Sequence, residues 1–501
     1  MKSTGSRINN HRGGFGSLFS AIMSILILSA CSPQPPITVY ITPFPLSATE
    51  APAQQPTALA TRPVYQPGTL VAYTARTGDN LPALAHHFNT TVKEILENNP
   101  QLSEKTTTLT PGENLQIPIY YEALWGNPFQ IIPDSLYING PAQIGFDTKS
   151  FVNAHPGWLK NYTSLAGGEV RRGADLIDYV SLEYSISPRL LLALAEYQAG
   201  ALSVETLEPQ EKVYPLGYED EFHQGFYLQL LWAANTLNNG YYSWRSGKLG
   251  TITRLDGSIE HPDPWQNAAT VALQNYFSQV LPVADYHKAI YSEGLYNTYA
   301  ALFGDPWQHT SDHIPGDLQQ PALRLPFVPG KTWSYTGGPH SAWGEGAPLA
   351  ALDFAPPSVV GGCAASNEFV TAMADGQIVR SEKGLAMLDL DGDGDEHTGW
   401  VILYLHLGLN DKIRPGMLVK TGDLIGHPSC EGGSATGTHV HIARKYNGEW
   451  IEADSVVPFN LEGWIAKNGV VPYQGSLSNY GRIITASDKG LVNSYITAGN
   501  P

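Results

Sequence analysis

The sequence GHPSCEGGSATGTHVH at residues 426–441 restricts the possible folds of this chain more than any other part of it. It ends in His439-Val440-His441, with Ile442 next. In a β-strand this alternation places both imidazoles on one face and both aliphatic side chains on the other. Such a pair can share a metal, or one histidine can bind it while the other transfers protons. A histidine pair also occurs on ordinary solvated strands, so the rest of the sequence has to decide between these interpretations.

Three more candidate residues lie upstream. His406 follows Tyr404 and Leu405 in the apolar run WVILYLHLGL, and strand alternation puts His406 and Tyr404 on one face. The alternative for His406 is an ordinary core histidine. His340 and Asp353 lie in GGPHSAWGEGAPLAALDFAPP, with twelve residues between them.

With these residues, the stretch 325–474 resembles the lysostaphin/LytM-type zinc endopeptidases, which cut peptidoglycan peptides. The shared landmarks, in order, are the His-Asp pair, ADG at 374–376, YLHL at 404–407, VKTGDLIG at 419–426 and SATGTHVH at 434–441. The resemblance implies an antiparallel β-sheet metallopeptidase domain at 325–480.

The resemblance also implies roles for individual residues. His340, Asp353 and His441 are the expected Zn²⁺ ligands, and His406 and His439 the expected catalytic residues. The spacing between His340 and Asp353 is wider than is usual in this family, so another histidine, such as His313, is the alternative first ligand.

The N-terminus predicts export and anchoring. Basic residues precede a short apolar run at 15–28, which is typical of a signal peptide over residues 1–31 rather than a membrane-spanning helix. The following LSAC resembles a bacterial lipobox, which implies a lipid on Cys31 and a location outside the cytoplasm, attached to the membrane and facing the cell wall. The alternative is an ordinary signal peptide with a chance cysteine. Residues 32–70, rich in Pro, Ala and Thr, predict a disordered tether.

Residues 71–120 resemble one LysM module, a βααβ unit that binds N-acetylglucosamine-containing glycans. The matching stretches are YT at 73–74, TGDNL at 77–81 and PGENLQIP at 111–118. Apolar residues at helical spacing predict two helices between them, the second capped by Thr90 or Thr91. The alternative is a small structural domain without a ligand.

Residues 136–320 predict a helical domain. Its segment SISPRLLLALAEYQAGALS resembles the start of a lysozyme/transglycosylase-type domain, but Gln198 stands where that family has its catalytic glutamate. Glutamine is not a general acid, and Glu183 and Glu196 are out of position. We therefore expect a spacer or glycan-recognition domain without glycosidase activity.

Short strands with turn signals dominate after residue 325. We expect one hairpin at 369–379, around Asp375-Gly376, and a second that pairs 385–390 with 400–406. The connection within the second hairpin carries Asp389, Asp391, Asp393 and Asp395, in an order that matches the opening of a Ca²⁺-binding loop. The closing glutamate is replaced by Trp400, so an acidic, exposed hairpin tip is the alternative.

The chain has three cysteines. Outside the cytoplasm the two that remain after Cys31, Cys363 and Cys430, favour a disulfide, with zinc ligation as the alternative. The net charge of −17 and the absence of a basic cluster exclude nucleic acid as a partner.

The sequence thus predicts a multidomain α+β protein with a LysM module, a helical middle domain and an antiparallel β-sheet metallopeptidase domain. Its predicted function is a membrane-anchored zinc endopeptidase that hydrolyses peptide cross-links of peptidoglycan. The alternatives are a non-catalytic wall-binding lipoprotein that recruits or activates other murein hydrolases, and a purely structural anchoring lipoprotein. Zinc content and the metal-ligand set distinguish these from the enzyme.

Overall fold

The computed structural model describes residues 62–358, 360–408 and 413–499. The chain divides into two units, Met1–Ala58 and Leu59–Pro501, and all described residues belong to the second. Cys31, the signal peptide and most of the predicted tether lie outside the described residues. Among the described helices, none has the length and apolar character needed to cross a membrane.

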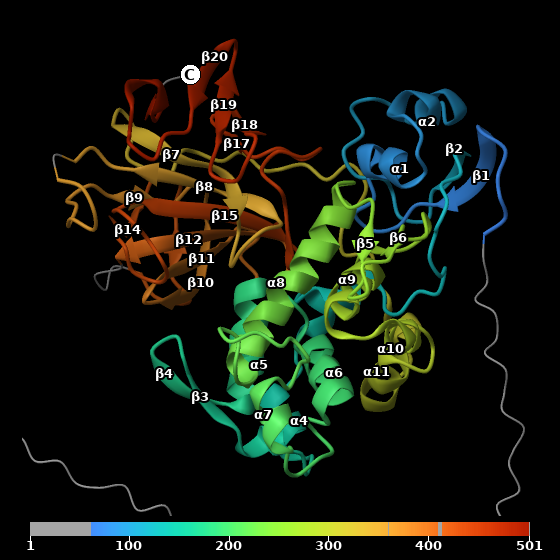
Figure 1. The fold of residues 1–501 in the computed structure, drawn as a ribbon. Coiled ribbons are helices and arrows are strands. Elements are labelled where there is room, and N and C mark those ends of the chain that lie inside the picture. Colours follow the sequence, from blue (N-terminus) through green and yellow to red (C-terminus); the bar gives the residue numbers. More distant parts are fainter. Residues whose placement is uncertain (1–61, 359, 409–412, 500–501) are drawn as a thin grey trace, which may run out of the picture. The chain divides into compact units, whose positions relative to one another are not determined.

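The first element group is a small βααβ unit, coloured blue in Figure 1. Strands β1 (Thr69–Thr74) and β2 (Asn114–Ile119) pair antiparallel, and helices α1 (Leu81–His87) and α2 (Val92–Asn98) lie between them in the sequence. The Asn80 side chain caps α1, and Thr91 forms a capping box with Glu94 at the start of α2. The structure thus selects Thr91 as the cap of the second helix.

The middle of the chain is helical. Its longer helices are α5 (Gly173–Tyr184), α6 (Pro188–Ala199), α8 (Phe226–Arg245) and α9 (Ala268–Val280). The shorter ones are α3 (Asp134–Tyr137), α4 (Thr148–Asn153), α7 (Pro209–Val213), α10 (Val283–Ala289), α11 (Leu295–Phe303) and the 3₁₀ turns η1 (Pro141–Gln143), η2 (Trp158–Asn161) and η3 (Pro306–His309). Two hairpins join them, β3 (Thr163–Ala166) with β4 (Glu169–Arg172), and β5 (Ile252–Thr253) with β6 (Ile259–Glu260).

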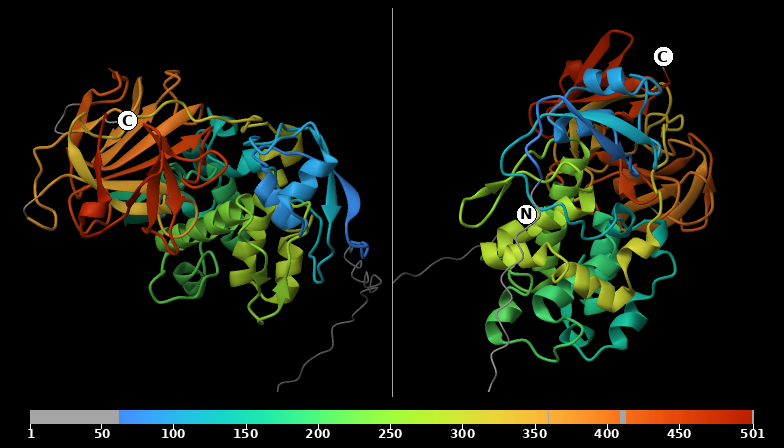
Figure 2. Two further views of the ribbon diagram at one scale, coloured as in Figure 1. Left: turned by 90° about the horizontal axis from the view of Figure 1, so that it is seen from above. Right: turned by 90° about the vertical axis from the view of Figure 1, so that its right-hand side faces the viewer.

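One large sheet dominates the C-terminal part of the chain, with strand order β13-β10-β11-β12-β15-β8-β7-β21. These strands are β7 (Thr332–Ser341), β8 (Leu349–Ala355), β10 (Gly376–Glu382), β11 (Gly384–Asp389), β12 (Trp400–Gly408), β13 (Leu418–Val419), β15 (Val440–Tyr446) and β21 (Tyr495–Thr497). Three short strands pair beside this path: β9 (Val370–Thr371), β14 (Leu424–Pro428) and β16 (Glu449–Trp450). Figure 2 shows the same strands from two further directions.

A second sheet of four antiparallel strands follows: β17 (Asn460–Leu461), β18 (Trp464–Asn468), β19 (Gly475–Asn479) and β20 (Arg482–Thr485). A last 3₁₀ turn, η4 (Val492–Ser494), precedes β21. Because β21 pairs with β7, the large sheet includes residues beyond the predicted range 325–480. The long helices and the large antiparallel sheet occupy separate stretches of the sequence, which makes the fold α+β.

The two predicted hairpins have different outcomes. Strands β11 and β12 pair antiparallel, as expected for 385–390 and 400–406. The hairpin at 369–379 is wrong, because β9 pairs with β14 whereas β10 pairs with β11 and β13. The Asp375-Gly376 dipeptide connects two strands that do not pair with each other.

The two faces of the large sheet pack against different partners. Along β12, Val401 and Leu403 belong to a core shared with the helices, whereas Ile402 and Tyr404 belong to a core within the C-terminal strands. This alternation follows from the period of a strand. The helices therefore cover one face of the sheet that carries the candidate site.

Buried ion pairs also join these parts of the unit. Arg245 of α8 pairs with Glu449 of β16 at 2.9 Å, and Arg380 of β10 pairs with Glu183 of α5 at 2.8 Å. The Arg245 guanidinium also donates to the Thr77 carbonyl oxygen of the βααβ unit at 2.7 Å. The helices are thus linked by charged side chains to both neighbouring element groups.

Candidate active site

Three adjacent strands bring the predicted metal ligands together. His441 on β15 lies opposite Asp353 on β8, and β8 pairs on its other edge with β7, which carries His340. The twelve residues between His340 and Asp353 are accommodated because β7 and β8 form a hairpin whose connection runs over residues 342–348. The wide spacing in sequence is therefore compatible with close contact in space.

The three side chains converge through one atom each. His340 Nε2 lies 3.0 Å from His441 Nδ1, and both nitrogens lie 3.3 Å from Asp353 Oδ1. Zinc–ligand bonds of about 2.0–2.2 Å place neighbouring ligands of a tetrahedral site about 3.3 Å or slightly more apart. All three residues are buried. Their spacing therefore fits three corners of a zinc tetrahedron.

Hydrogen bonds on the far side of each ring fix which nitrogen faces the cluster. His340 Nδ1 donates to the Gly338 carbonyl oxygen at 2.8 Å, and His441 Nε2 donates to the Ala342 carbonyl oxygen at 3.1 Å. A carbonyl oxygen only accepts, so the opposite nitrogens present lone pairs to Asp353 Oδ1. That oxygen is itself buried and makes no hydrogen bond of good geometry with the described residues. Three converging acceptors repel one another unless a positive charge lies between them.

The pKa values of Asp353 and His340 fit the same demand for positive charge, whereas burial lowers the pKa of His441. Although burial opposes ionisation, the neighbouring histidines hold the pKa of Asp353 well below its usual range. The Asp353 carboxylate in turn raises the pKa of His340, against the effect of burial. The site thus favours a cation at the position where the three atoms meet.

His406 and His439 lie beside this cluster. Their rings are 4.4 Å apart, and His439 Nε2 is 3.8 Å from Asp353 Oδ1. His406 Nδ1 donates to the Glu431 carbonyl oxygen at 2.9 Å, and His439 Nδ1 donates to the Gly437 carbonyl oxygen at 2.7 Å. Each ring therefore has a fixed orientation with Nε2 left for other chemistry.

His406 reaches the site through an unusual backbone conformation. Its φ of +58° is left-handed, and its ring lies 6.3 Å from that of His441, on the sheet face covered by the helices. Tyr404 points to the opposite core, where its hydroxyl accepts from the Met373 N–H. The prediction that His406 and Tyr404 share a face is wrong, because the left-handed residue interrupts strand alternation. Burial and the neighbouring His439 and His441 lower the pKa of His406 to about 4, so its ring is neutral near pH 7.

Tyr473 is a site residue that the sequence did not reveal. It lies in the connection between β18 and β19, and its ring stacks on His340 with 4.1 Å between ring centroids. Its backbone N–H donates to the Pro339 carbonyl oxygen at 3.2 Å, and its carbonyl oxygen accepts from the Gly338 N–H at 2.8 Å. No local pattern around Tyr473 points to this contact.

The connection between β7 and β8 is held by helix α8. The Asn235 side-chain oxygen accepts from the Glu345 N–H at 2.9 Å, and the Asn239 oxygen accepts from the Ala347 N–H at 2.6 Å. The same connection begins at Ala342, whose carbonyl oxygen accepts from His441. A helix far away in sequence therefore helps to hold the carbonyl that orients a candidate ligand.

The predicted disulfide between Cys363 and Cys430 is present. The Thr438 N–H, close to the cross-link and next to His439, donates to the Gly362 carbonyl oxygen at 3.0 Å. Cysteine ligation of a metal is thus excluded for this pair. The cross-link braces the glycine-rich loop that leads into β15.

Other predicted residues lie elsewhere. His313 Nε2 donates to the Glu449 carboxylate at 2.7 Å, and His313 is not part of the metal cluster. Glu183 is paired with Arg380, the Glu196 carboxylate accepts from the Leu202 N–H, and the Gln198 amide donates to the Leu216 carbonyl oxygen. These contacts give each side chain a structural role.

The aspartates of the β11–β12 connection cap their own loop. Asp389, Asp391 and Asp393 approach one another, but their oxygens accept backbone N–H bonds two residues further along. Asp395 accepts from the His397 N–H in the same way. The Ca²⁺ site predicted there gains no support, since local backbone groups already satisfy these carboxylates.

Two family models match parts of the chain. The model described as "LasA, N-terminal domain" matches residues 130–317, and the LysM domain model matches residues 73–118. The first match covers the helical middle segment, for which the sequence suggested a lysozyme-type relationship. The second covers the βααβ unit.

Relatives and solved structures extend these matches. The chain is 26% identical over 338 residues to Protease LasA of Pseudomonas aeruginosa, spanning 64% of this chain and 74% of that protein. It is 32% identical over 140 residues to Beta-lytic metalloendopeptidase of Achromobacter lyticus, spanning 26% of this chain and 34% of that protein. The M23 metalloprotease pseudoalterin from deep-sea has a TM-score of 0.29 and 26% identity, over 33% of this chain and 96% of its own. The chain is thus similar to metallopeptidases and carries a LysM match.

Proposed function

We propose that this protein is a zinc metalloendopeptidase that hydrolyses peptide cross-links of bacterial peptidoglycan. The convergence of His340 Nε2, Asp353 Oδ1 and His441 Nδ1 carries this proposal, because it offers three buried acceptors at tetrahedral spacing. Three protein ligands leave a fourth position for water or substrate. Similarity to metalloendopeptidases supports the same chemistry.

His340, Asp353 and His441 would hold the zinc. When bound, it supplies a water of lowered pKa and polarises the scissile carbonyl. The single carboxylate reduces the positive charge of the site without neutralising it. The hydrogen bonds from His340 to Gly338 and from His441 to Ala342 keep the coordinating nitrogens deprotonated and aimed at the site.

His406 and His439 would perform the proton transfers. Since the Nδ1 atom of each ring donates to a backbone carbonyl, Nε2 is the atom that accepts a proton from the attacking water. Protonated at Nε2, either ring can stabilise the charge on the tetrahedral intermediate and then donate to the leaving amine. Their contact at 4.4 Å lets both serve one substrate.

The finer parts of the proposal concern location. The segment that matches the LysM domain would hold the enzyme on wall glycan, and a lipid on Cys31 would hold it at the membrane surface, outside the cytoplasm. Labelling with a fatty-acid probe tests the anchor: the label should appear on the wild type and disappear in Cys31→Ala. Equal labelling of both would disprove lipidation of Cys31.

Metal analysis combined with digestion of purified peptidoglycan tests the enzyme. His441→Ala and Asp353→Ala should lose zinc and activity together. His406→Ala and His439→Ala should retain zinc and lose turnover by about a hundredfold or more. Peptidoglycan binding without cleavage by zinc-loaded wild type would instead support the non-catalytic wall-binding protein.

A further inference from the structure

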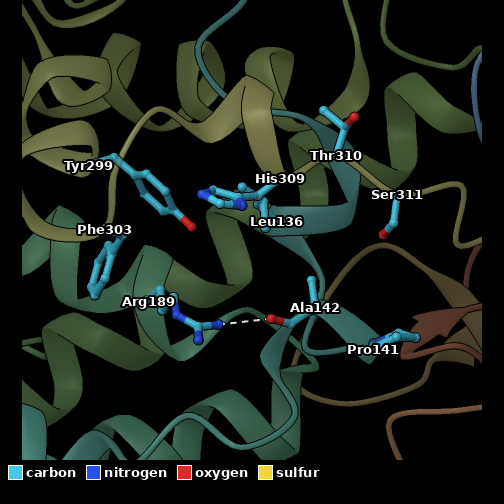
Figure 3. A pocket seen from close by; sticks show the side chains of 9 residues that line it. All are labelled: Leu136, Pro141, Ala142, Arg189, Tyr299, Phe303, His309, Thr310 and Ser311. Atoms are coloured by element: carbon cyan, nitrogen blue, oxygen red, sulfur yellow. Dashed lines mark hydrogen bonds between the residues drawn. The ribbon is translucent and has the colours of Figure 1, made fainter.

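The helical segment contains a pocket that the proposed peptidase chemistry does not use. It has a volume of about 530 Å³ and is lined from α3, η1, α6, α11, His309 of η3 and the two residues after it. Figure 3 shows Tyr299 and Phe303 on one side of it and Thr310 and Ser311 on the other. The pocket is therefore large enough for a monosaccharide or a short peptide end.

Arg189 supplies the positive charge of this pocket. One guanidinium nitrogen donates to the Ala142 carbonyl oxygen at 2.9 Å and to Gln143 Oε1 at 2.7 Å, both neutral acceptors. The group also lies 4.3 Å from the Phe146 ring centroid, which keeps it in place. Within the described residues no carboxylate forms an ion pair with Arg189, and its remaining N–H groups have no hydrogen-bond partner there.

An arginine without an opposite charge is unusual at a partly buried position. Burial lowers the pKa of Arg189, and the hydroxyl of Tyr299 is the neighbour that acts against this effect. Two other buried arginines, Arg245 and Arg380, pair with carboxylates, whereas Arg444 of β15, like Arg189, donates to neutral oxygens. Arg189 thus offers a pre-positioned cation that the protein itself does not neutralise.

Other residues of the pocket wall would recognise the uncharged part of a ligand. Tyr299 and Phe303, four residues apart on α11, present aromatic surface suited to a sugar face or an apolar side chain. Thr310 and Ser311 add hydroxyl groups opposite them. A guanidinium beside aromatic rings and hydroxyls matches a small organic acid better than a highly charged polyanion.

We propose that this pocket binds the carboxylate of a small acid at Arg189, with the rest of that molecule against Tyr299 and Phe303. Two sources share this chemistry: a sugar carrying an acidic substituent, and the free C-terminus of a short peptide. We name these two sources on the basis of the proposed function, because peptidoglycan contains both kinds of acid. The pocket would then give the helical segment a recognition role separate from hydrolysis.

Isothermal titration calorimetry on the full chain tests this inference with matched probes. N-acetylmuramic acid is compared with N-acetylglucosamine, which lacks the acidic substituent, and acetyl-D-alanyl-D-alanine with its C-terminal amide. One of the two acids should bind at concentrations of about 1 mM or lower, and its neutral match about tenfold more weakly or worse. The acid that binds identifies the source.

Variants separate this pocket from the LysM segment and from the metal site. Arg189→Gln should weaken acid binding about tenfold or more, and Arg189→Lys should retain part of it. Arg171→Gln is the matched control, because Arg171 also lies over an aromatic ring, that of Tyr179, but outside the pocket. If Arg189→Gln fails to fold, Tyr299→Phe is the second test. This variant removes one hydroxyl from the pocket and should weaken acid binding severalfold.

Binding should persist in Asp353→Ala, which is designed to lose zinc. If the protein binds the acid but never cleaves peptidoglycan, the proposed function is disproved while the inference about the pocket still holds. The inference is overturned if neither acid shows binding that depends on Arg189, if a neutral match shows equally strong binding that depends on Arg189, or if the folded Arg189→Gln or Tyr299→Phe protein binds the acid like wild type. Dependence on Arg189 is required because N-acetylglucosamine is also expected to bind the segment that matches the LysM domain.

Discussion

Replacing Glu449 by glutamine should destabilise the protein strongly, because this buried carboxylate lies at the junction of three parts of the chain. It accepts from Arg245 Nε at 2.9 Å and from the Tyr241 hydroxyl at 2.9 Å, both on α8. It also contacts His313 Nε2 at 2.7 Å, in the segment that leads to the large sheet. Glutamine keeps the shape of the side chain but removes the negative charge.

The pKa of Glu449 gives the expected size of the loss in the free energy of unfolding. Burial alone would raise it, but Arg245 and His313 lower it from 4.5 to about 2. A difference of about 2.5 pH units corresponds to about 3 kcal/mol of stability at neutral pH. Breaking a buried pair by removing one partner costs about 3–5 kcal/mol. Since Asp134 remains 3.3 Å from Arg245, we expect the lower end, about 3 kcal/mol.

Urea denaturation, followed by tryptophan fluorescence, measures the difference in the free energy of unfolding between wild type and Glu449→Gln. The folded pKa of Glu449 is depressed, so its stabilisation is fully present above the unfolded pKa near 4.5 and is lost as pH falls towards about 2. The gap between wild type and Glu449→Gln should therefore be largest at pH 7 and shrink between pH 4.5 and 2. Glu97→Gln is the matched control, because its pair with Lys93 is exposed and is worth at most about 1 kcal/mol. A Glu449→Gln protein as stable as the control at pH 7 would refute the reasoning.

Two further predictions concern the surroundings of the candidate site. Asn235→Ala with Asn239→Ala should weaken zinc binding about tenfold in chelator competition, because the β7–β8 connection loses its anchors on α8. Asn275→Ala, which removes a comparable hydrogen bond between α9 and α8, should leave zinc affinity unchanged, and equal loss in both proteins would contradict a specific role. Replacing Cys363 and Cys430 by serine should lower the free energy of unfolding by about 2–4 kcal/mol, since the cross-link closes a long loop of 67 residues. An unchanged urea midpoint would contradict this estimate.

The sequence allowed prediction of the candidate site where the signal was local. His439, which forms an isolated bridge with Ser429 just before β15, and His441 both approach Asp353 Oδ1, as strand alternation predicts. The two cysteines that remain after Cys31 favoured the observed disulfide. A cap at Thr90 or Thr91 could be predicted for the same reason, since a capping box spans only four residues, and the structure selects Thr91.

Prediction failed where the outcome depends on distant partners or on single backbone angles. The Asp375-Gly376 turn looked like a hairpin, yet β9 finds its partner in β14, more than fifty residues later. His406 changes faces through one left-handed residue, which strand periodicity does not reveal. Tyr473 and Asn239 approach the site from elements far away in sequence.

The wide spacing between His340 and Asp353 shows both what the sequence predicts and what it does not. In the sequence alone, it weakened the assignment of His340 as a ligand, because the spacing is wider than is usual in the family that the sequence resembles. In the structure the intervening residues form the connection that docks on α8 and supplies the Ala342 carbonyl to His441. The extra length therefore has a physical use: it couples a candidate ligand to the helical segment. The His313 alternative fails for the same spatial reason, since that ring is held by Glu449 in the network that fixes β16 beside β15. The orientation of His441 thus depends on a contact between α8 and the β7–β8 connection, which makes that contact part of the candidate site.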